Sequence, residues 1–486
     1  MSAHWKIMPT CTITSALTPI FGTSGNDILA ATAEFQALFG RAGNDVLSTQ
    51  FNNTALDGGA GNDQLDVSLN LIETAPVPLF EVHSCAEGGS GNDTITVDIT
   101  AFSDSAPITI NAFVDGGSGN DVIIVSSVSD ALLDSVVTNV ILGGAGNDVI
   151  DALAIGGDFF GNESTAINKI DGGSGNDRIT ATAVVFSNSS LLAANYLNGG
   201  SGNDFLSAST SVDSNVAAPE GKNVLKGGAG NDELVADHQT DGENFVTTLT
   251  SELFGGTGND TMTATMLALA EDIATGKNML DGGAGNDVMS ANIVAGTWFN
   301  PGATACNTLH GGGGNDTLTA FADTNFYNDI FRGMAHNVLH GGTGNDQLTA
   351  TIAANSDGKS ELYGGSGRDT LTAIGGAENI LDGGSGNDTI TGSNGTDFVR
   401  GGTGDDCLTG MAGADEFIFA TGDGNDEVKD FEDGADLIRI TAGATSFADV
   451  AISAQGSDTL IQFSNVSVLL LNIDPSVIDA SDFVFG

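Results

Sequence analysis

The chain has 486 residues, with 63 acidic and 13 basic side chains and a formal net charge of −50. This balance excludes nucleic-acid binding through charge and predicts repulsion from anionic membrane surfaces. Hydrophobic residues make up 40% of the chain, so we expect a large folded core rather than a disordered acidic chain.

The N-terminal segment precedes a long repetitive region. It lacks a basic run followed by an apolar stretch, so we expect no cleaved signal peptide and no transmembrane span. We expect residues 1–20 to form a leader strand or cap in front of the repeats.

A short glycine-rich motif then recurs sixteen times. Its full form is Gly-Gly-x-Gly-Asn-Asp-x-aliphatic, as in the stretch from Gly58 to Leu65. Glycine permits backbone angles that are costly for other residues, and Asn tolerates left-handed geometry, so the motif predicts a tight turn. The final Asp of the sixteen copies occupies Asp27, Asp45, Asp63, Asp93, Asp121, Asp148, Asp177, Asp204, Asp232, Asp260, Asp287, Asp316, Asp346, Asp369, Asp388 and Asp406.

Aliphatic residues stand at fixed distances from each turn. One lies two residues after every Asp, and another lies two residues before the first Gly in every copy except the one with Ala86. Because alternate residues of a strand share a face, this pattern predicts a solenoid of strands and turns with inward aliphatic columns. A flexible glycine-rich linker, the alternative, would not keep an aliphatic residue in register.

Carboxylates and backbone carbonyls are hard oxygen ligands, which suit Ca²⁺. The motif resembles the calcium-binding repeats of RTX (hemolysin-type) proteins over about residues 20–440. The resemblance implies an all-β parallel β-roll or β-solenoid of about sixteen coils, with calcium ions between successive turns. The implied ligands are the sixteen Asp side chains and the carbonyls of Gly58, Gly88, Gly116, Gly143, Gly172, Gly199, Gly227, Gly255, Gly282, Gly311, Gly341, Gly364, Gly383 and Gly401.

Sixteen turns leave room for about fifteen Ca²⁺ ions, which would reduce the net charge to about −20. Without metal the packed carboxylates would repel one another, so we expect folding to depend on calcium. Weak sites of this kind suit the millimolar calcium outside cells. We therefore expect a secreted protein, extracellular or at the cell surface.

The spacing of the motifs departs from tandem nonapeptides. The Asp-to-Asp step is 18 residues at both ends of the repeat region and 27–30 residues in its middle. One calcium-binding turn per coil therefore remains, and we expect a single column of sites along one edge. The middle coils should have wider sheets or longer far loops.

A second polar column lies four residues before the glycine pair in ten successive coils. We expect stacked amides that hydrogen bond along the solenoid axis; the alternative is that Asn only shapes a turn there. The column comprises Asn139, Asn168, Asn195, Asn223, Ser251, Asn278, Asn307, Asn337, Ser360 and Asn379.

The motif pattern changes after Asp406, so we assign residues 21–410 to the solenoid and 411–486 to a C-terminal capping region. The runs 459–463 and 466–471 predict a hairpin cap. The last five residues, an Asp followed by hydrophobic residues and Gly, resemble the uncleaved type I secretion signal of RTX proteins; a last strand is the plain alternative. We expect no intrachain disulfide among Cys11, Cys85, Cys306 and Cys407, because they would lie several coils apart.

We expect no enzyme, because the repeats begin at residue 22 and neither His-Glu-x-x-His nor Gly-x-Ser-x-Gly occurs. His310 and His340 precede glycine pairs in neighbouring coils and should stack, either as exposed turn residues, which we favour, or as a transition-metal site.

Three functions remain open. We favour a secreted calcium-binding structural protein that folds and self-assembles on Ca²⁺ outside the cell, as a homo-oligomeric or polymeric subunit of a surface layer, sheath or filament. The alternative is a calcium-dependent adhesin, with a cell-surface polysaccharide as a further partner, or an ice-binding module. In that module Thr319, Thr349, Thr372, Thr391 and Thr409 would line up outside. A toxin or bacteriocin is less favoured, because no long apolar segment is present.

Overall fold

The computed structural model describes residues 16–74, 77–158, 163–186, 190–213, 218–240, 246–298, 302–325, 333–354 and 356–486. Most of the predicted leader, residues 1–15, lies outside this range, as does Cys11. The chain divides into two compact units, which are taken one at a time. Unit 1 comprises Met1–Gly255 with Leu269–Glu271, and unit 2 comprises Gly256–Ala268 with Asp272–Gly486.

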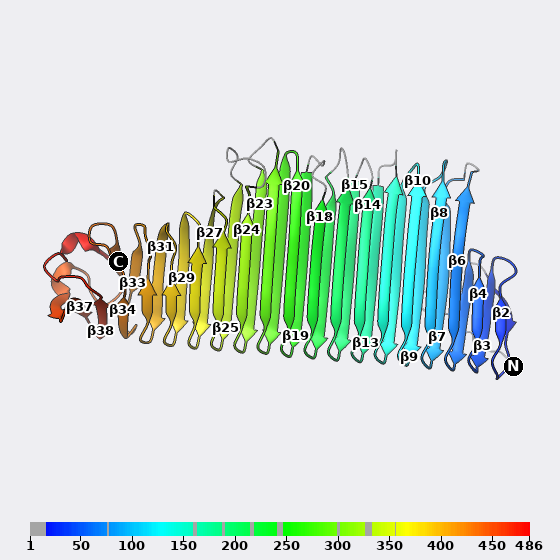
Figure 1. The fold of residues 1–486 in the computed structure, drawn as a ribbon, viewed down its shortest axis with the longest axis horizontal. Coiled ribbons are helices and arrows are strands. Elements are labelled where there is room, and N and C mark those ends of the chain that lie inside the picture. Colours follow the sequence, from blue (N-terminus) through cyan, green and yellow to red (C-terminus); the bar gives the residue numbers. More distant parts are fainter. Residues whose placement is uncertain are drawn as a thin grey trace. The chain divides into compact units, whose positions relative to one another are not determined.

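Unit 1 consists of two parallel sheets whose strands alternate along the chain (Figure 1, blue to green). Sheet A of this unit contains β1 (Thr18–Phe21), β3 (Gln36–Ala42), β5 (Thr54–Ala60), β7 (Phe80–Ser90), β9 (Ile108–Ser118), β11 (Ser135–Ala145), β13 (Glu163–Ser174), β15 (Ser190–Ser201), β17 (Glu220–Ala229) and β19 (Val246–Thr257). Sheet B contains β2 (Ile28–Ala30), β4 (Val46–Thr49), β6 (Gln64–Glu73), β8 (Thr94–Ser103), β10 (Val122–Ala131), β12 (Val149–Asp158), β14 (Arg178–Phe186), β16 (Phe205–Asp213) and β18 (Glu233–Thr240).

Successive coils pair so that equivalent motif positions face each other. Leu38 pairs with Leu56 in sheet A, and Leu47 pairs with Leu65 in sheet B. These four side chains are fully buried, and Ala86, the one exception to its column, is fully buried too. The predicted inward columns are therefore confirmed, because a strand period of two places every second residue between the sheets.

The strands of unit 1 lengthen along the chain. β4 has four residues, whereas β6 has ten and β13 has twelve. The additional residues of the longer coils thus extend the sheets, as the 27–30-residue steps predicted.

Unit 2 continues the same parallel pattern with strands that shorten toward the C-terminus. Its sheet A contains β21 (Ile273–Ala284), β23 (Ala303–Gly313), β25 (Met334–Thr343), β27 (Asp357–Ser366), β29 (Glu378–Ser385), β31 (Thr396–Thr403), β33 (Glu416–Phe419), β35 (Leu437–Ile440) and β39 (Phe483–Phe485). Its sheet B contains β20 (Thr261–Ala270), β22 (Val288–Thr297), β24 (Thr317–Asp323), β26 (Gln347–Ile352), β28 (Thr370–Ile374), β30 (Thr389–Thr391), β32 (Cys407–Thr409) and β34 (Asn425–Val428).

Parallel pairing extends past the sixteenth motif copy, which ends at Asp406, because β31 pairs with β33 and β33 pairs with β35. The number of coils therefore differs from the motif count of sixteen. An antiparallel meander of β36 (Ala451–Gln455), β37 (Asp458–Phe463) and β38 (Val466–Leu470) follows. The predicted hairpin cap is thus confirmed, and β38 joins it to the solenoid by pairing in parallel with β34.

The only helical segments among the described residues are η1 (Phe447–Asp449) and η2 (Ala480–Asp482), both single 3₁₀ turns. No helix in this part of the chain is long and apolar enough to cross a membrane.

The predicted amide ladder runs through the interior but is interrupted at two of its ten positions, because the buried hydroxyls of Ser251 and Ser360 have no hydrogen-bond partner. In unit 1 the Asn139 side-chain amide donates to Asn168 Oδ1 at 2.9 Å, and Asn168 donates in turn to Asn195 at 2.9 Å. In unit 2 Asn307 donates to Asn337 at 2.9 Å. Each of these amides also donates to a backbone carbonyl of sheet B; for Asn139 the acceptor is Leu153 at 3.0 Å. Buried amides that satisfy one another cost little to bury and hold the two sheets in register.

The expectation of no intrachain disulfide is wrong for Cys85, which is disulfide-bonded. Cys306 and Cys407 are free thiols.

Candidate metal centre

The repeated turn is built from glycines that no other residue replaces without strain. In the turn from Gly58 to Asp63, Gly59 has a φ of +98° and Gly61 a φ of +132°. A Cβ on Gly61 would collide with the carbonyl oxygen of Gly43, one coil earlier. The turn therefore contains glycine at these positions because the backbone is left-handed there and the neighbouring coil leaves no room for a Cβ.

The sixteen predicted Asp residues form one column within each unit. The backbone N–H of Asp63 donates to Asp93 Oδ1 at 2.7 Å, and the same contact repeats from Asp27 to Asp232 in unit 1. In unit 2 it repeats from Asp260 to Asp406. Apart from the half-buried Asp27, these side chains are at most 3% exposed. Each carboxylate is therefore fixed in orientation through one of its two oxygens.

The second carboxylate oxygen is buried and has no hydrogen-bond donor in thirteen of these residues. They are Asp45, Asp63, Asp93, Asp121, Asp148, Asp177, Asp204, Asp287, Asp316, Asp346, Asp369, Asp388 and Asp406. A buried charged oxygen without a partner is costly, so the ionised carboxylates require a cation.

Backbone carbonyls lie at the same place. The position that a Cβ of Gly58 would occupy is 2.5 Å from Asp63 Oδ2 and 2.7 Å from the Gly88 carbonyl oxygen of the next coil. Equivalent positions place thirteen of the fourteen predicted carbonyls beside an Asp Oδ2, namely those of Gly58, Gly88, Gly116, Gly143, Gly172, Gly199, Gly227, Gly255, Gly311, Gly341, Gly364, Gly383 and Gly401. The described contacts show no such placement for Gly282. Only glycine leaves the space between the Asp Oδ2 and the carbonyl oxygen open, because the Cβ of any other residue would fill it.

These residues fit calcium. Within the described ranges, no three His, Cys, Asp or Glu side chains converge as a metal cluster, so most ligands must be backbone oxygens. One carboxylate with several carbonyls is a hard oxygen set, which suits Ca²⁺ better than a transition metal. Calcium bound there would neutralise the carboxylates and join each coil to the next.

The Asn of the motif has a role that the sequence reasoning missed. The backbone N–H of Asn44 donates to Asn26 Oδ1 at 2.9 Å, and the pattern repeats from coil to coil. The Asn ladder runs opposite to the Asp ladder, since each Asn accepts from the following coil and each Asp from the preceding one. The two opposed ladders together hold each turn against the turns of both neighbouring coils.

The expected single column is wrong for the last coils of unit 2, where the opposite edge carries a second column. Asp397 N–H donates to Asp415 Oδ1 at 2.9 Å, and Asp415 N–H donates to Asp436 Oδ1 at 2.9 Å. Gly392 and Gly410 stand five residues before Asp397 and Asp415, as Gly58 stands before Asp63. The Gly-x-x-Gly-x-Asp spacing was the available signal, and requiring Gly-Asn-Asp hid it.

The first column also extends by one residue beyond the prediction. Asp406 N–H donates to Asp426 Oδ1 at 3.1 Å. The Oδ2 atoms of Asp415 and Asp426 are buried without a donor, like those of the predicted residues. Both columns therefore enter the region that we had assigned to the cap.

Burial raises the pKa of the column carboxyls. The pKa of Asp148 and that of Asp388 rise to about 7, mainly through burial and further through the neighbouring Asp charges; the backbone N–H donor opposes the rise. The pKa of Asp415 rises to about 7 and that of Asp426 to about 8 for the same reasons. Carboxyls whose pKa is raised by burial and by neighbouring carboxylates are typical of cation-binding sites.

A pH dependence follows for the protein without calcium. A carboxyl with a folded-state pKa above its unfolded value favours the fold fully below about pH 4, and it loses that contribution as the pH rises through about 7. We expect calcium-free protein to gain β-structure when the pH is lowered from about 7.5 to about 5. Circular dichroism of the calcium-free protein across this pH range measures the gain. An equally weak β-signal at about pH 7.5 and about pH 5 would contradict the prediction.

The family model of the RTX calcium-binding nonapeptide repeat (four copies) matches most of the chain. The matched residues are 21–54, 36–65, 113–130, 138–154, 164–183, 193–213, 220–241, 252–265, 274–293, 307–333, 332–351, 356–390, 374–408, 382–417 and 391–428. These segments contain most of the Gly-Asn-Asp turns.

Among solved structures, the crystal structure of the extracellular lipase LipA from Serratia marcescens is similar at 18% identity. The match covers 49% of this chain and 40% of the lipase chain, with a TM-score of 0.23. A likeness of this size carries no argument about activity. No curated protein sequence matches the chain.

Proposed function

Because this chain belongs to the family of RTX calcium-binding nonapeptide repeat proteins, we propose that it is a secreted structural protein. It folds on Ca²⁺ outside the cell and then self-assembles as a subunit of a surface layer, sheath or filament. The observation that carries the proposal is the extent of the Asp columns, which run from Asp27 to Asp232 in unit 1 and, in unit 2, from Asp260 to Asp426 and from Asp397 to Asp436.

Proteins of this family are typically secreted, and this chain's calcium chemistry favours the same location. Carbonyl-rich sites with few carboxylates per ion are weak, about 10⁻⁴ to 10⁻³ M in extracellular modules, so they fill only outside the cell. The route in this proposal is type I secretion with the tail after Asp482 as its signal. About fifteen ions per chain remain part of the proposal.

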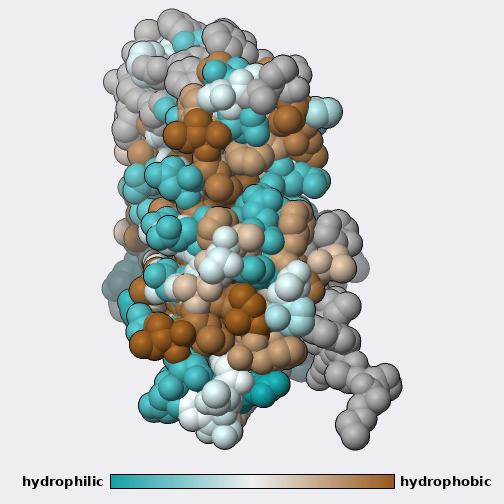
Figure 2. Space-filling model, turned by 90° about the vertical axis from the view of Figure 1, so that its right-hand side faces the viewer, coloured by the Kyte–Doolittle hydropathy of each residue, from teal (hydrophilic) through white to brown (hydrophobic). Residues whose placement is uncertain are grey.

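Self-association is supported by the exposed end of unit 1. Within residues 16–255, which the structure describes with gaps, β1 and β2 are the first strands of their sheets, and Phe21 and Ile28 are 50% and 85% exposed there. The space-filling view toward this end shows apolar side chains among polar ones (Figure 2). The first strands of a solenoid offer unpaired backbone groups beside apolar side chains, and a second copy of the chain can cover both.

Sedimentation velocity in calcium tests the self-association. Wild-type protein should form assemblies that grow with concentration, and Ile28→Lys should shift them toward monomer. The matched control is Ile374→Lys, because Ile374 is 50% exposed in β28, far from this end in sequence. A wild-type protein that stays monomeric at high concentration with calcium contradicts the proposal, as does an equal effect of both substitutions.

The proposal gives the chain no catalytic role. It is supported by the absence from the sequence of the zinc-protease and nucleophile-elbow motifs.

An ice-binding module is the second candidate, favoured by a threonine ladder in unit 2. Thr319, Thr349, Thr372, Thr391 and Thr409 occupy one register position on β24, β26, β28, β30 and β32. The strands β24, β28 and β30 carry a further Thr two residues earlier. Such a ladder repeats hydroxyl and methyl groups at the strand spacing of about 4.8 Å.

Thermal hysteresis tests this candidate. Calcium-loaded protein should depress the freezing point below the melting point, and Thr391→Arg should remove the effect without unfolding the chain. No measurable gap between the two temperatures would exclude ice binding.

A further inference from the structure

The outer face of sheet A in unit 2 carries a row of polar and aromatic side chains at one register position. Asp281 of β21 pairs with His310 of β23, His310 pairs with His340 of β25, and His340 pairs with Tyr363 of β27. The two histidines are therefore strand residues rather than the turn residues that we favoured. Neither belongs to the calcium columns.

The two imidazole rings are stacked, as the sequence predicted. The His310 and His340 ring centroids are 4.8 Å apart with an angle of 5° between the planes. A centroid distance equal to the strand spacing means that both side chains adopt the same conformation on neighbouring strands. Equivalent ring nitrogens therefore lie side by side.

The pair is accessible on one side and supported on the other. His310 is exposed and His340 is half-buried. Tyr363 stacks on the far face of His340, with centroids 4.8 Å apart and planes 9° apart. The ring faces are thus covered by one another, and the edges, where the nitrogens lie, are the parts that a small ligand can reach.

The charge around the pair favours a cation. The pKa of His340 lies below its usual value because of burial and the adjacent His310, against a smaller opposing effect of Glu361. A neutral imidazole has a free lone pair for a metal. Asp281 stands next to His310 in the row, and the strongly acidic chain concentrates cations at its surface.

We propose that His310 and His340 together bind one divalent transition-metal ion of the Cu²⁺, Ni²⁺ and Zn²⁺ class. Metal–imidazole bonds of about 2.0–2.1 Å require the two nitrogens to be about 3.0–3.5 Å apart. Each imidazole lone pair lies in the plane of its ring, so both rings must turn out of the parallel stack for the two nitrogens to converge on one ion. Rotation of both side chains at this outer face supplies that change. Imidazole nitrogen selects these ions over Ca²⁺, so calcium in the columns does not compete. Water completes the coordination, because the described residues bring no third His, Cys, Asp or Glu side chain to the pair.

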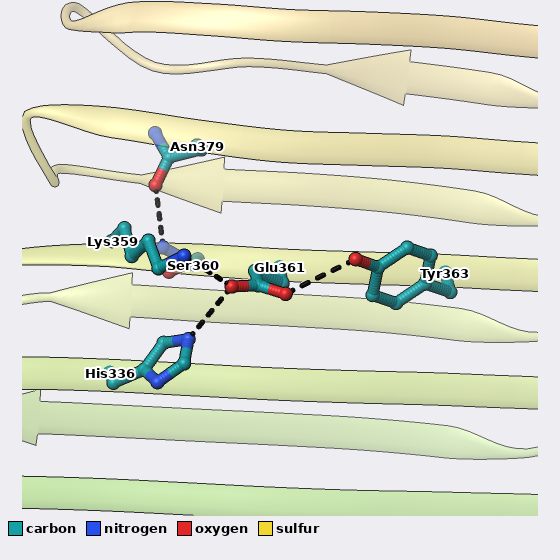
Figure 3. Close-up of polar contacts among 6 residues, drawn as sticks. All are labelled: His336, Lys359, Ser360, Glu361, Tyr363 and Asn379. Carbon is teal, nitrogen blue, oxygen red and sulfur yellow. Dashed lines mark hydrogen bonds and ion pairs between the residues drawn. The ribbon is translucent and has the colours of Figure 1, made fainter.

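A third histidine of the same sheet, His336, belongs to a neighbouring polar cluster around Glu361 (Figure 3). His336 Nε2 lies 3.2 Å from Glu361 Oε1, and Lys359 Nζ lies 2.5 Å from the same oxygen. The Tyr363 hydroxyl donates to Glu361 Oε2 at 3.1 Å. The contact with Glu361 thus engages His336, and the hydrogen bond to Glu361 holds the Tyr363 ring against His340. His336 lies on β25 with His340 but outside the stacked pair, so it serves as a matched control.

Titration of calcium-loaded full-length protein with Zn²⁺, followed by calorimetry, tests the proposal, and Cu²⁺ spectra identify the ligands. We expect one site per chain and electron paramagnetic resonance coupling to two imidazole nitrogens. His310→Gln and His340→Gln should each weaken binding by about tenfold or more, whereas His336→Gln should leave it unchanged. Circular dichroism of each variant in calcium checks its fold.

Three outcomes would overturn the site. These are no Zn²⁺ or Cu²⁺ binding at micromolar concentrations, equal loss in His336→Gln, and spectra with oxygen or thiolate coordination only. Cys306→Ser in the same background removes the free thiol of β23 as a competing ligand.

Discussion

Chelation of calcium at neutral pH is expected to convert the protein from a β-rich fold into an expanded chain. The buried Asp carboxylates stand one coil apart in a column, and the Oδ2 atoms of the thirteen named above lack donors. Removing the cation leaves a line of uncompensated buried charges, in a chain of net charge −50, and this outweighs the apolar core. Circular dichroism should lose its β-signal, and small-angle scattering should approach a radius of gyration of about 80 Å.

Magnesium provides the control for this experiment. Mg²⁺ carries the same charge but demands a small octahedral site and keeps its water, so a carbonyl-rich turn does not suit it. Restored calcium should refold the chain, whereas an equal concentration of Mg²⁺ should not. Unchanged β-structure after complete chelation would contradict the calcium dependence.

Gly119→Ala should destabilise the calcium-loaded fold by about 3 kcal/mol or more. Gly119 has a φ of +129°, and a Cβ there would collide with the carbonyl oxygen of Gly91 in the preceding coil. Both colliding groups belong to backbone held in parallel ladders, so neither can move aside. Denaturant unfolding in saturating calcium measures the loss.

Gly25→Ala is the matched control, because Gly25 occupies the same position of the motif in the first copy. Its φ lies outside the left-handed region, and the nearest atom to an added Cβ is 3.9 Å away. Its cost should stay below about 1 kcal/mol. Equal losses in the two variants would show that glycine acts there only through chain entropy, not through coil contact.

The sequence predicted the solenoid well because the repeat samples the same physical constraint many times. Leu47, Leu65 and their equivalents could be placed inward from strand periodicity alone, and they are buried. Arg41 shows why the glycine pair recurs: it replaces the second Gly, yet it adopts a φ of +82°. The backbone therefore dictates the turn, and glycine is the residue that meets it without strain.

The calcium column was predictable as a set of residues but not as an atomic arrangement. The motif identified the Asp carboxylates. It did not show that Oδ1 accepts a backbone N–H while Oδ2 lacks a donor, which only the structure reveals. The opposed Asn ladder was missed for the same reason. A motif gives the order of groups along the chain, but not the hydrogen bonds between coils.

The remaining errors arose where one coil differs from the others. Asp397, Asp415 and Asp436 form their column without the Gly-Asn-Asp signature, and Cys85 is disulfide-bonded although no coil spacing suggested it. Reasoning from a repeat transfers what the copies share. It says little about features that occur in a few coils.

The location of bound calcium tests the central claim most directly. Anomalous diffraction from calcium-loaded crystals should show a line of peaks along the Asp column of each unit, between an Asp Oδ2 and the carbonyl of the first Gly of the next coil. A shorter second line should appear beside Asp397 and Asp415. A folded, calcium-equilibrated chain with no peaks at these positions would contradict the account.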